Sequence, residues 1–252
     1  MILEIDMGNT RLKWRVRNGY ENVAQGFIGI ESAFEPLAAE LESYRNLLTN
    51  VWVVSVVGDA IEQRLTNWSE AYVQLHPEFA RSAAACGVVR NGYSDPQALG
   101  ADRWSGLVAA HHSCDAACVV VSFGTAVTLD LVAKDGKHLG GYIAPGVNLM
   151  LNSLASGTRQ VRLADKPVTS DLSPAKGTVD AIHSACDAML VGLVNNGLQQ
   201  LRNAVPPDEL IEIIFTGGDA IRLSPFFPGA KLIPGLVLDG LAYILDGSQR
   251  LE

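Results

Sequence analysis

Asp6-Met7-Gly8-Asn9-Thr10 and Ser122-Phe123-Gly124-Thr125-Ala126 indicate the architecture of this chain, because each stretch joins two runs that read as β-strands. We expect the flanking strands at residues 2–6, 11–17, 117–122 and 127–132, and a third strand after each pair, at 23–30 and 137–143. The two similar starts lie nearly half the chain apart. They predict a duplicated architecture of two lobes, with a ligand-binding cleft between the lobes.

Helices and further strands follow each start. Apolar residues at steps of three and four predict amphipathic helices at 34–48, 61–68, 96–112, 178–202 and 235–246. Other strands are expected at 51–57, 72–75 and 210–215, the first of them buried on both faces. The fold class is therefore α/β, with two tandem lobes of mixed sheet flanked by helices. We place the lobes at residues 1–114 and 115–252.

Composition narrows the class of protein. The chain has 252 residues, 48% hydrophobic content and a net charge of −8, which is unfavourable for direct binding to nucleic acid. No apolar run approaches the length of a membrane span, and the first residues lack the features of a signal peptide, so we expect a cytoplasmic protein without membrane contact. The four cysteines and the adjacent pair His111–His112 lack zinc spacing, which favours buried thiols and partly exposed histidines over a metal site.

The two glycine turns have the chemistry of phosphate binding. Glycine lets the backbone approach a phosphate, and exposed amides in a tight turn form an anion-binding nest. Side-chain donors come from Asn9, Thr10 and Thr125. Positive charge comes from Arg11 and Lys13, although an exposed strand face is the alternative interpretation of these two residues.

Asp6 ends the first strand. At this position a carboxylate can hold Mg²⁺ through water, or it can brace the turn by accepting backbone hydrogen bonds. A third small-residue turn, Thr216-Gly217-Gly218-Asp219-Ala220, suits the close approach of a nucleotide sugar or base. Asp219 would cap the following helix or meet a hydroxyl, but Gly-Gly at a strand end is also an ordinary structural feature.

Together these motifs resemble the type III pantothenate kinases of the acetate and sugar kinase/Hsp70/actin superfamily, over nearly the whole chain. The resemblance rests on 6–14, on Asn91-Gly92-Tyr93 with Pro96 and Leu99, on Gly100-Ala101-Asp102-Arg103-Trp104, on 124–130, on 140–146 and on Gly177-Thr178. The turn motifs occur across the superfamily, whereas Gly-Ala-Asp-Arg-Trp with the upstream tyrosine is specific to this family. The lobes are thus expected to be ribonuclease H-like, as in actin-like ATPases.

The resemblance implies ATP-dependent phosphorylation of pantothenate to 4'-phosphopantothenate, the first step toward coenzyme A, by direct in-line transfer. It makes Asp102 the general base and assigns pantothenate contacts to Tyr93, Gly100, Ala101, Asp102, Arg103 and Thr178. Contacts with ATP and its phosphates fall to Asp6, Met7, Gly8, Asn9, Thr10, Arg11, Leu12, Lys13, Gly124, Thr125, Gly217 and Gly218.

The resemblance also implies cofactors and an assembly state. ATP would act with Mg²⁺, and many family members require potassium or ammonium. Most members carry an aspartate where this chain has Ser122, which places a monovalent cation in doubt. Family members are dimers, and the alanines, Leu107 and Val108 of the helix at 96–112 suggest that this helix lies at or near a homodimer interface.

Phosphoryl transfer itself benefits from a carboxylate that accepts the proton of the attacking hydroxyl. We expect Asp102 about two turns into its helix, with Gly100 also inside that helix, and Arg103 keeping the carboxylate ionised or binding the substrate's carboxylate. Without the flanking motif, an exposed Asp-Arg pair on a helix face would be the better interpretation.

Two other functions stay open. A sugar kinase or a polyphosphatase of the same superfold would share the phosphate turns and differ in substrate. A non-catalytic accessory role in gene regulation has been described for members of the family, but Asp6, Asp102 and Thr125 favour a working enzyme.

Overall fold

The computed structural model describes residues 1–157 and 171–246 of the chain. Its contacts divide the protein into two compact units. The first unit comprises Met1–Ala109 together with the chain from Leu236 onward, and the second comprises Ala110–Gly235. Each unit is built around one five-stranded sheet.

The first sheet has the strand order β3-β2-β1-β4-β5. Its strands are β1 (Ile2–Met7), β2 (Arg11–Asn18), β3 (Glu21–Gly29), β4 (Asn50–Ser55) and β5 (Glu78–Ala80). β1, β2 and β3 form an antiparallel meander, while β4 pairs in parallel with β1, and β5 in parallel with β4. The sheet is therefore mixed, as the alternation and the buried run at 51–57 predict.

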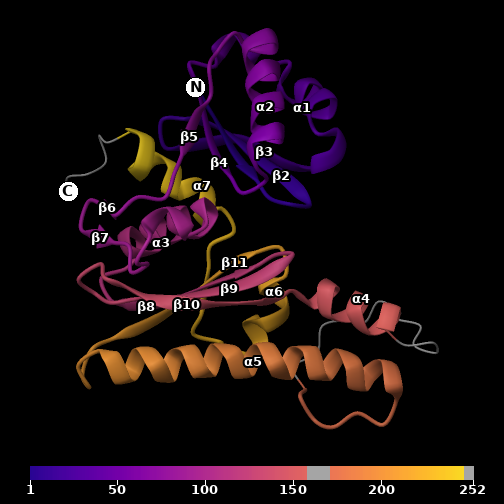
Figure 1. Cartoon of the computed structure of the whole chain (residues 1–252), viewed down its shortest axis with the longest axis vertical. Coiled ribbons are helices and arrows are strands. Elements are labelled where there is room, and N and C mark those ends of the chain that lie inside the picture. Colours follow the sequence, from indigo (N-terminus) through magenta and orange to yellow (C-terminus); the bar gives the residue numbers. More distant parts are fainter. Residues whose placement is uncertain (158–170, 247–252) are drawn as a thin grey trace. The chain divides into compact units, whose positions relative to one another are not determined.

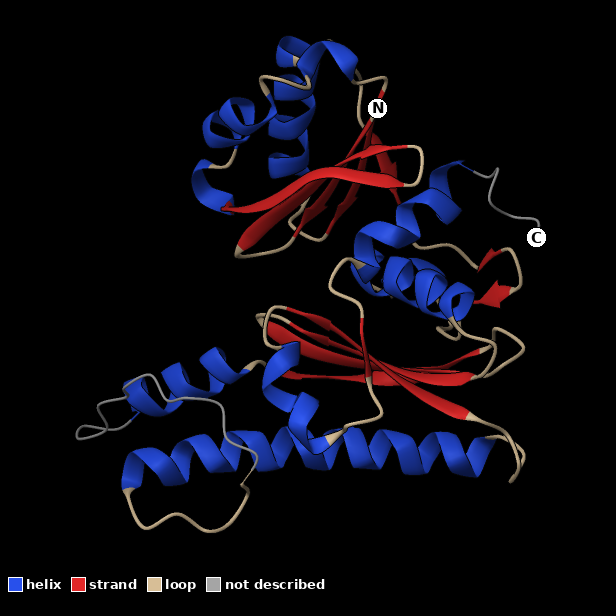
Figure 2. Ribbon diagram, turned by 180° about the vertical axis from the view of Figure 1, so that it is seen from behind, coloured by secondary structure: helices blue, strands red, loops and turns tan. Residues whose placement is uncertain are grey.

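Helices cover one face of this sheet (Figure 2). The face is apolar because alternate residues such as Leu3, Ile5 and Leu12 point to the same side, where they pack in one core with residues of α1 (Phe34–Leu41) and α2 (Asp59–Tyr72). The remaining elements of this part are the 3-10 helices η1 (Ile30–Ser32), η2 (Arg45–Leu47) and η3 (Pro96–Ala98), the hairpin β6 (Ala85–Cys86) and β7 (Val89–Arg90), and α3 (Ala101–Ser113).

The end of the chain returns to the first unit. Within α7 (Leu236–Leu241), Leu238 and Leu241 pack with Trp52 and Val54 of β4, and the π-helix η5 (Ala242–Asp246) continues the segment. This return differs from the expected division into 1–114 and 115–252, which placed the segment in the second lobe.

An ion-pair network reinforces this return. Arg15 Nε lies 2.6 Å from Oε2 of the fully buried Glu4, and Arg15 Nη1 lies 2.6 Å from Asp239 Oδ1 of α7. Arg17 Nε completes the network 3.0 Å from Glu4 Oε1. Burial raises the pKa of Glu4 even beside these arginines, so its charge depends on both of them.

The second sheet repeats the plan of the first with the strand order β10-β9-β8-β11-β12. Its strands are β8 (Ala117–Phe123), β9 (Ala126–Val132), β10 (His138–Pro145), β11 (Ile211–Gly217) and β12 (Lys231–Leu232). Again the first three strands form an antiparallel meander and the first pairs in parallel with the fourth. The duplication and the mixed sheets predicted from the sequence are confirmed.

A long helix, α5 (Thr178–Ala204), runs along one face of this sheet (Figure 1). Cys186, Leu190, Val194 and Leu201 of α5 share one core with the odd-numbered residues of β8. Gly197 lets the helix come close, because a Cβ at this position would lie 2.8 Å from both methyl carbons of Leu129. The other elements are α4 (Val147–Gly157), α6 (Ala220–Leu223) and the 3-10 helix η4 (Ser224–Phe226).

Some expected elements are wrong or were missed. The strand at 72–75 does not form, because α2 continues to Tyr72. There Tyr72 stacks on Trp68, one helical turn earlier, and Trp68 stacks on Phe34 of α1. The helix expected at 34–48 ends at Leu41. The pattern also gave no prediction of α4 or β12.

The helix expected at 96–112 is broken. Asp95 Oδ1 accepts the amide of Gln97, as its capping role predicts, but it caps only the short helix η3. Leu99 is extended, and α3 starts afresh at Ala101. Asp102 is therefore in the first turn of α3, and Gly100 precedes the helix, contrary to the expectation that both lie inside it.

Candidate active site

The first glycine turn is closed by one backbone hydrogen bond, from the Gly8 amide to the Arg11 carbonyl at 3.0 Å. A Cβ at position 8 would lie 3.3 Å from that carbonyl oxygen, so the turn is tight at the point where glycine stands. Asn9, Thr10 and Arg11 are exposed at its tip. The donors expected to meet phosphate are thus presented outward by a short, well-defined loop.

Asp6 and Lys13 face one another across the β1–β2 hairpin. The register pairs the two residues directly, and Lys13 Nζ lies 3.3 Å from Asp6 Oδ2. The Asp6 side chain is 11% exposed. Burial raises the pKa of Asp6, Lys13 opposes this change, and the charge of Asp102 raises the pKa further. Two carboxylates far apart in the sequence are therefore electrostatically coupled within the first unit.

Asp102, Arg103 and Tyr93 form the second part of the site. Asp102 Oδ1 accepts the Arg103 amide at 2.8 Å, which fixes the carboxylate at the start of α3. Arg103 is buried, and its Nη1 donates to the Tyr93 hydroxyl at 2.7 Å while its guanidinium carbon lies 5.4 Å from the centre of the tyrosine ring. The alternative interpretation, an exposed Asp-Arg pair on a helix face, is therefore wrong for Arg103, which is buried.

Asn91 supports this arrangement in a way that its sequence motif did not predict. Its Nδ2 donates to the carbonyls of Ala83 at 3.2 Å and Pro96 at 3.1 Å, and its Oδ1 accepts the Tyr93 amide at 3.0 Å. One amide side chain therefore ties three parts of the loop together. The signal that could have found it is the Asn-Gly pair, which is typical of a turn whose side chain bonds its own backbone.

The second glycine turn lies between β8 and β9. It is closed by the Gly124 amide on the Ala126 carbonyl at 3.1 Å and is held from below by the Gly146 amide on the Thr125 carbonyl at 2.9 Å. A Cβ at Gly146 would clash with the carbonyls of Gly124 and Thr125. Gly146 therefore supports the second glycine turn, because only a residue without a side chain can lie this close to its backbone.

The third turn lies against the end of β8. Gly217 has φ of +92°, and a Cβ there would clash with the Phe123 backbone. The Asp219 amide donates to the Phe123 carbonyl at 3.4 Å. Since Gly124 follows Phe123, the second and third turns lie at one edge of the second sheet.

Asp219 occupies the cap position of α6, but its side chain makes no capping hydrogen bond, so of the two expected roles the capping one is wrong. The turn is instead secured by Arg222, whose Nε and Nη2 donate to Asp187 of α5 at 2.5 and 3.0 Å. Thr178 is the exposed first residue of the same helix α5.

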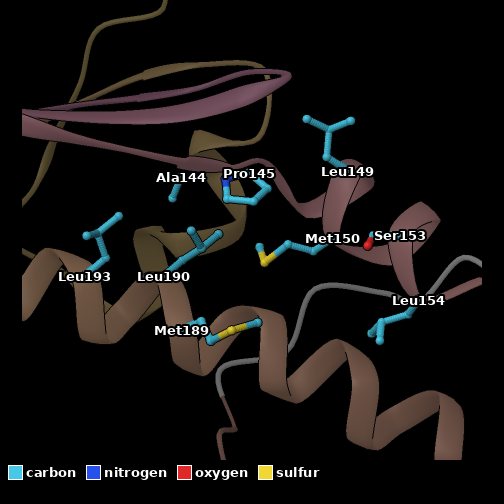
Figure 3. Close-up of a pocket in the computed structure, with 9 residues that line it drawn as sticks. All are labelled: Ala144, Pro145, Leu149, Met150, Ser153, Leu154, Met189, Leu190 and Leu193. Atoms are coloured by element: carbon cyan, nitrogen blue, oxygen red, sulfur yellow. The ribbon is translucent and has the colours of Figure 1, made fainter. Parts of the chain in front are cut away.

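A separate groove in the second unit is apolar (Figure 3). It has a volume of about 670 Å³ and lies between the end of β10, α4 and α5. Its lining includes Leu149, Met150, Leu154, Met189, Leu190 and Leu193. None of the residues assigned to phosphate or pantothenate lines it, and such a surface offers few donors to an anion.

Asp6 is the carboxylate best suited to a divalent metal. Among residues 1–157 and 171–246, no group of three or more His, Cys, Asp or Glu side chains is arranged to hold a metal ion. A buried single carboxylate at a phosphate turn fits Mg²⁺, which keeps several waters and binds through few protein ligands. Over the same residues, no helix has both the length and the apolar character needed to cross a bilayer.

The buried charge of Asp6 has a measurable cost. Its raised pKa means that the ionised carboxylate is less favourable in the folded than in the unfolded protein. We therefore expect Asp6→Asn to raise the free energy of unfolding of the ligand-free protein at neutral pH, measured by urea denaturation. Because the folded wild type takes up a proton first as the pH falls, the advantage of the variant should shrink toward acid.

The matched control is Lys13→Met, which leaves Asp6 without its cation and should lower stability. If the wild-type protein were more stable than Asp6→Asn at neutral pH, the ionised Asp6 carboxylate would not be destabilised by its burial, and the prediction would be wrong.

Comparison with known proteins agrees with these motifs. A family model described as type III pantothenate kinase matches residues 2–200. A type III pantothenate kinase of Cellvibrio japonicus is 39% identical over 249 residues, covering 98% of this chain and 97% of the relative. One of Pseudomonas aeruginosa is 40% identical over 246 residues, covering 96% of this chain and 98% of the relative.

Solved structures share the fold. A Campylobacter jejuni protein described as a conserved putative Baf family transcriptional activator gives a TM-score of 0.68 at 20% identity, covering 99% of this chain and 100% of that one. The activator of the 2-hydroxyisocaproyl-CoA dehydratase from Clostridium difficile, with bound ADPNP, gives 0.51 at 14%, covering 100% and 98%. Identities this low show the fold alone. The family model and the full-length relatives show more: the chain belongs to the type III pantothenate kinase family.

Proposed function

We propose that the protein transfers the γ-phosphoryl group of ATP to the primary hydroxyl of pantothenate, giving 4'-phosphopantothenate, with Asp102 as the general base. The observation that carries this proposal is the coupling of Asp102 to Asp6 within the first unit. The charge of Asp102 acts on Asp6, which lies directly before the first glycine turn. The carboxylate of the substrate motif is therefore within electrostatic range of the proposed phosphate turn. Such a carboxylate can take the hydroxyl proton while the phosphoryl group is transferred.

The proposed reaction is a direct transfer with one proton acceptor. The hydroxyl oxygen forms a bond to the γ-phosphorus as the bond to the bridging oxygen of ADP breaks, and the hydroxyl proton passes to Asp102. Its carboxylate is oriented before the substrate arrives, because Oδ1 is held by the Arg103 amide.

Arg103 is the group we assign to the carboxylate of pantothenate. The planar guanidinium fork suits a carboxylate, and Tyr93 helps to fix its orientation by accepting a hydrogen bond from Nη1 at 2.7 Å. The family resemblance assigns Tyr93, beside Arg103, a contact with pantothenate as well. The family resemblance assigns further contacts with pantothenate to Gly100, Ala101 and Thr178.

The glycine turns are the proposed ATP site. The family resemblance assigns the phosphates to Asp6, Met7, Gly8, Asn9, Thr10, Arg11, Leu12 and Lys13 and to Gly124 and Thr125, and it assigns the nucleoside to Gly217 and Gly218. Mg²⁺, held through water at Asp6, would neutralise phosphate charge. The proposed location is the cytoplasm, with no membrane or nucleic-acid partner, in keeping with the net charge of −8.

Replacing the base tests the proposal directly. Asp102→Asn should keep the fold and lower kcat by about 10²–10⁴, the usual contribution of a general base. The measurement is ADP release with saturating pantothenate, alongside a panel of sugars and with polyphosphate. Asp115→Asn, at a side chain that is 97% exposed, is the control and should behave as wild type. Undiminished turnover of Asp102→Asn would remove Asp102 as the base, and a preference for sugars would overturn the substrate.

Gly100 offers a finer test, because it makes room for the base. A Cβ at position 100 would lie 2.7 Å from Asp102 Oδ1, closer than packed atoms allow. We expect Gly100→Ala to displace the carboxylate and reduce kcat by about 10-fold or more while the protein stays folded. Gly106→Ala lies in the same helix, where the nearest atom to a new Cβ is 3.9 Å away, and it should be tolerated. Equal turnover of the two variants would contradict this role.

We also propose a homodimer, from the family resemblance. Leu107, Val108, Ala109 and Ala110 of α3 are at most 3% exposed in the single chain, so these four side chains already pack within it, and any contact near α3 would involve other residues. Light scattering at micromolar concentration should give twice the mass of 26.9 kDa. A mass equal to one chain would refute the dimer.

Ser122 is the departure from the family that bears on a monovalent cation. It lies on β8 opposite Thr128 and beside Thr216, so neutral hydroxyl residues surround it in both directions of the sheet. A carboxylate there would attract a monovalent cation by about 4 kcal/mol at a separation of ~4 Å and an effective dielectric of about 20, before desolvation. The serine lacks this attraction.

We therefore expect activity in sodium salts to approach that in potassium or ammonium salts at equal ionic strength. Ser122→Asp should restore a preference for potassium, while Ser122→Ala should not. A strict potassium requirement in the wild type, saturating at low millimolar concentration, would show that other oxygens complete the site.

A further inference from the structure

Two cysteines lie close together at the start of β8, away from the residues assigned to catalysis. Cys114 follows the end of α3 and is half-buried, whereas Cys118 is the second residue of β8 and is fully buried. The other cysteines of the chain, Cys86 and Cys186, are both buried in other parts of the structure. Only Cys114 among the four is accessible from solvent while next to another thiol.

The local fold brings the two thiols together. Ala117, Val119 and Val121 belong to the core beneath α5, so the alternation of the strand turns Cys118 to the opposite face of the sheet. Cys114 Sγ lies 3.3 Å from the Ala110 carbonyl, which shows that the residue folds back over the last turn of α3. Its Sγ also lies 3.6 Å from the Ala116 carbonyl, at the start of the strand that carries Cys118, and Cys118 is the largest influence on the pKa of Cys114.

The surroundings make the two thiols unequal. The hydrogen bond from Cys118 lowers the pKa of Cys114 to about 7, with Lys231 acting in the same direction and burial and Glu212 opposing it. The same hydrogen bond, with burial, raises the pKa of Cys118 well above its usual range. The accessible sulfur is therefore the better nucleophile, and the buried one stays a neutral thiol at its side.

We propose that Cys114 and Cys118 form a reversible oxidation site that reacts with hydroperoxides and closes to an intramolecular disulfide. In the first step the Cys114 thiolate attacks the peroxide; an S–O bond forms, the O–O bond breaks, and the leaving oxygen takes a proton to become water or an alcohol. Cys114 is then a sulfenic acid.

In the second step Cys118 gives up its proton and attacks the Cys114 sulfur. The S–S bond forms, the S–O bond breaks, and the oxygen leaves as water. The two thiols together lose two electrons, which the peroxide has gained. A dithiol reductant reverses the reaction.

The expected reactivity is moderate. With a pKa of about 7, Cys114 is roughly half ionised at pH 7, against a few per cent for a thiol of pKa ≈ 8.5. The lower intrinsic nucleophilicity of a less basic thiolate removes part of this gain. The net expectation is a reaction about threefold faster than that of an ordinary exposed cysteine.

The test is exposure of the reduced full-length protein to a small excess of hydrogen peroxide, followed by alkylation and peptide mass spectrometry. We expect Cys114 and Cys118 to lose reactivity together, in a peptide lighter by two hydrogen atoms, while Cys86 and Cys186 are still alkylated after denaturation. Dithiothreitol should restore both thiols.

Two variants separate the steps. Cys118→Ser should leave Cys114 as a sulfenic acid that dimedone labels, and Cys114→Ser should keep Cys118 reduced under the same conditions. The proposal is overturned if Cys114 is oxidised no faster than Cys186, if the product links two chains, or if Cys118 is oxidised equally fast without Cys114.

Discussion

The pairing register of β1 with β2 is the constraint on which the first half of the site depends. It sets Asp6 opposite Lys13 and Glu4 opposite Arg15, so that each acidic residue meets a basic one on the same face of the sheet. The other face carries the apolar residues of the core. A shift of one residue would place Trp14 among the carboxylates and turn charges toward the core, which makes any other register very unfavourable.

The two halves of the molecule use the same hairpin for different purposes. In the first, the turn connects the two members of an ion pair, the largely buried Asp6 and the partly exposed Lys13, and supplies charge. In the second, Ser122 is neutral, and close backbone packing takes the place of charge, because Gly146 and Gly217 let two other segments touch the end of β8 and its turn. Duplication has thus preserved the strand order while the electrostatic character of the two turns has diverged.

Sequence patterns predicted what depends on neighbouring residues and missed what depends on distant ones. Alternation located the strands of both meanders, and the glycines located all three turns. The sequence pattern did not predict that Asp187 would bind Arg222, 35 residues away, or that Asn91 would bridge three loop segments. Neither contact gives rise to a repeating pattern in the sequence. The break before α3 was missed for a local reason: Asp95 and Pro96 are proper helix-start signals, and nothing in the pattern marks Leu99 as extended.

The return of the chain to the first sheet has a consequence for biosynthesis. Domains generally fold as units as they emerge from the ribosome, the earlier ones first. Here the sheet face formed by Trp52 and Val54 must wait for Leu238 and Leu241, which are made after the whole of the second unit. Arg15 likewise waits for its second partner, Asp239. The half that is translated first is consequently the half that is completed last, and a nascent chain arrested anywhere before residue 236 carries an unfinished first unit.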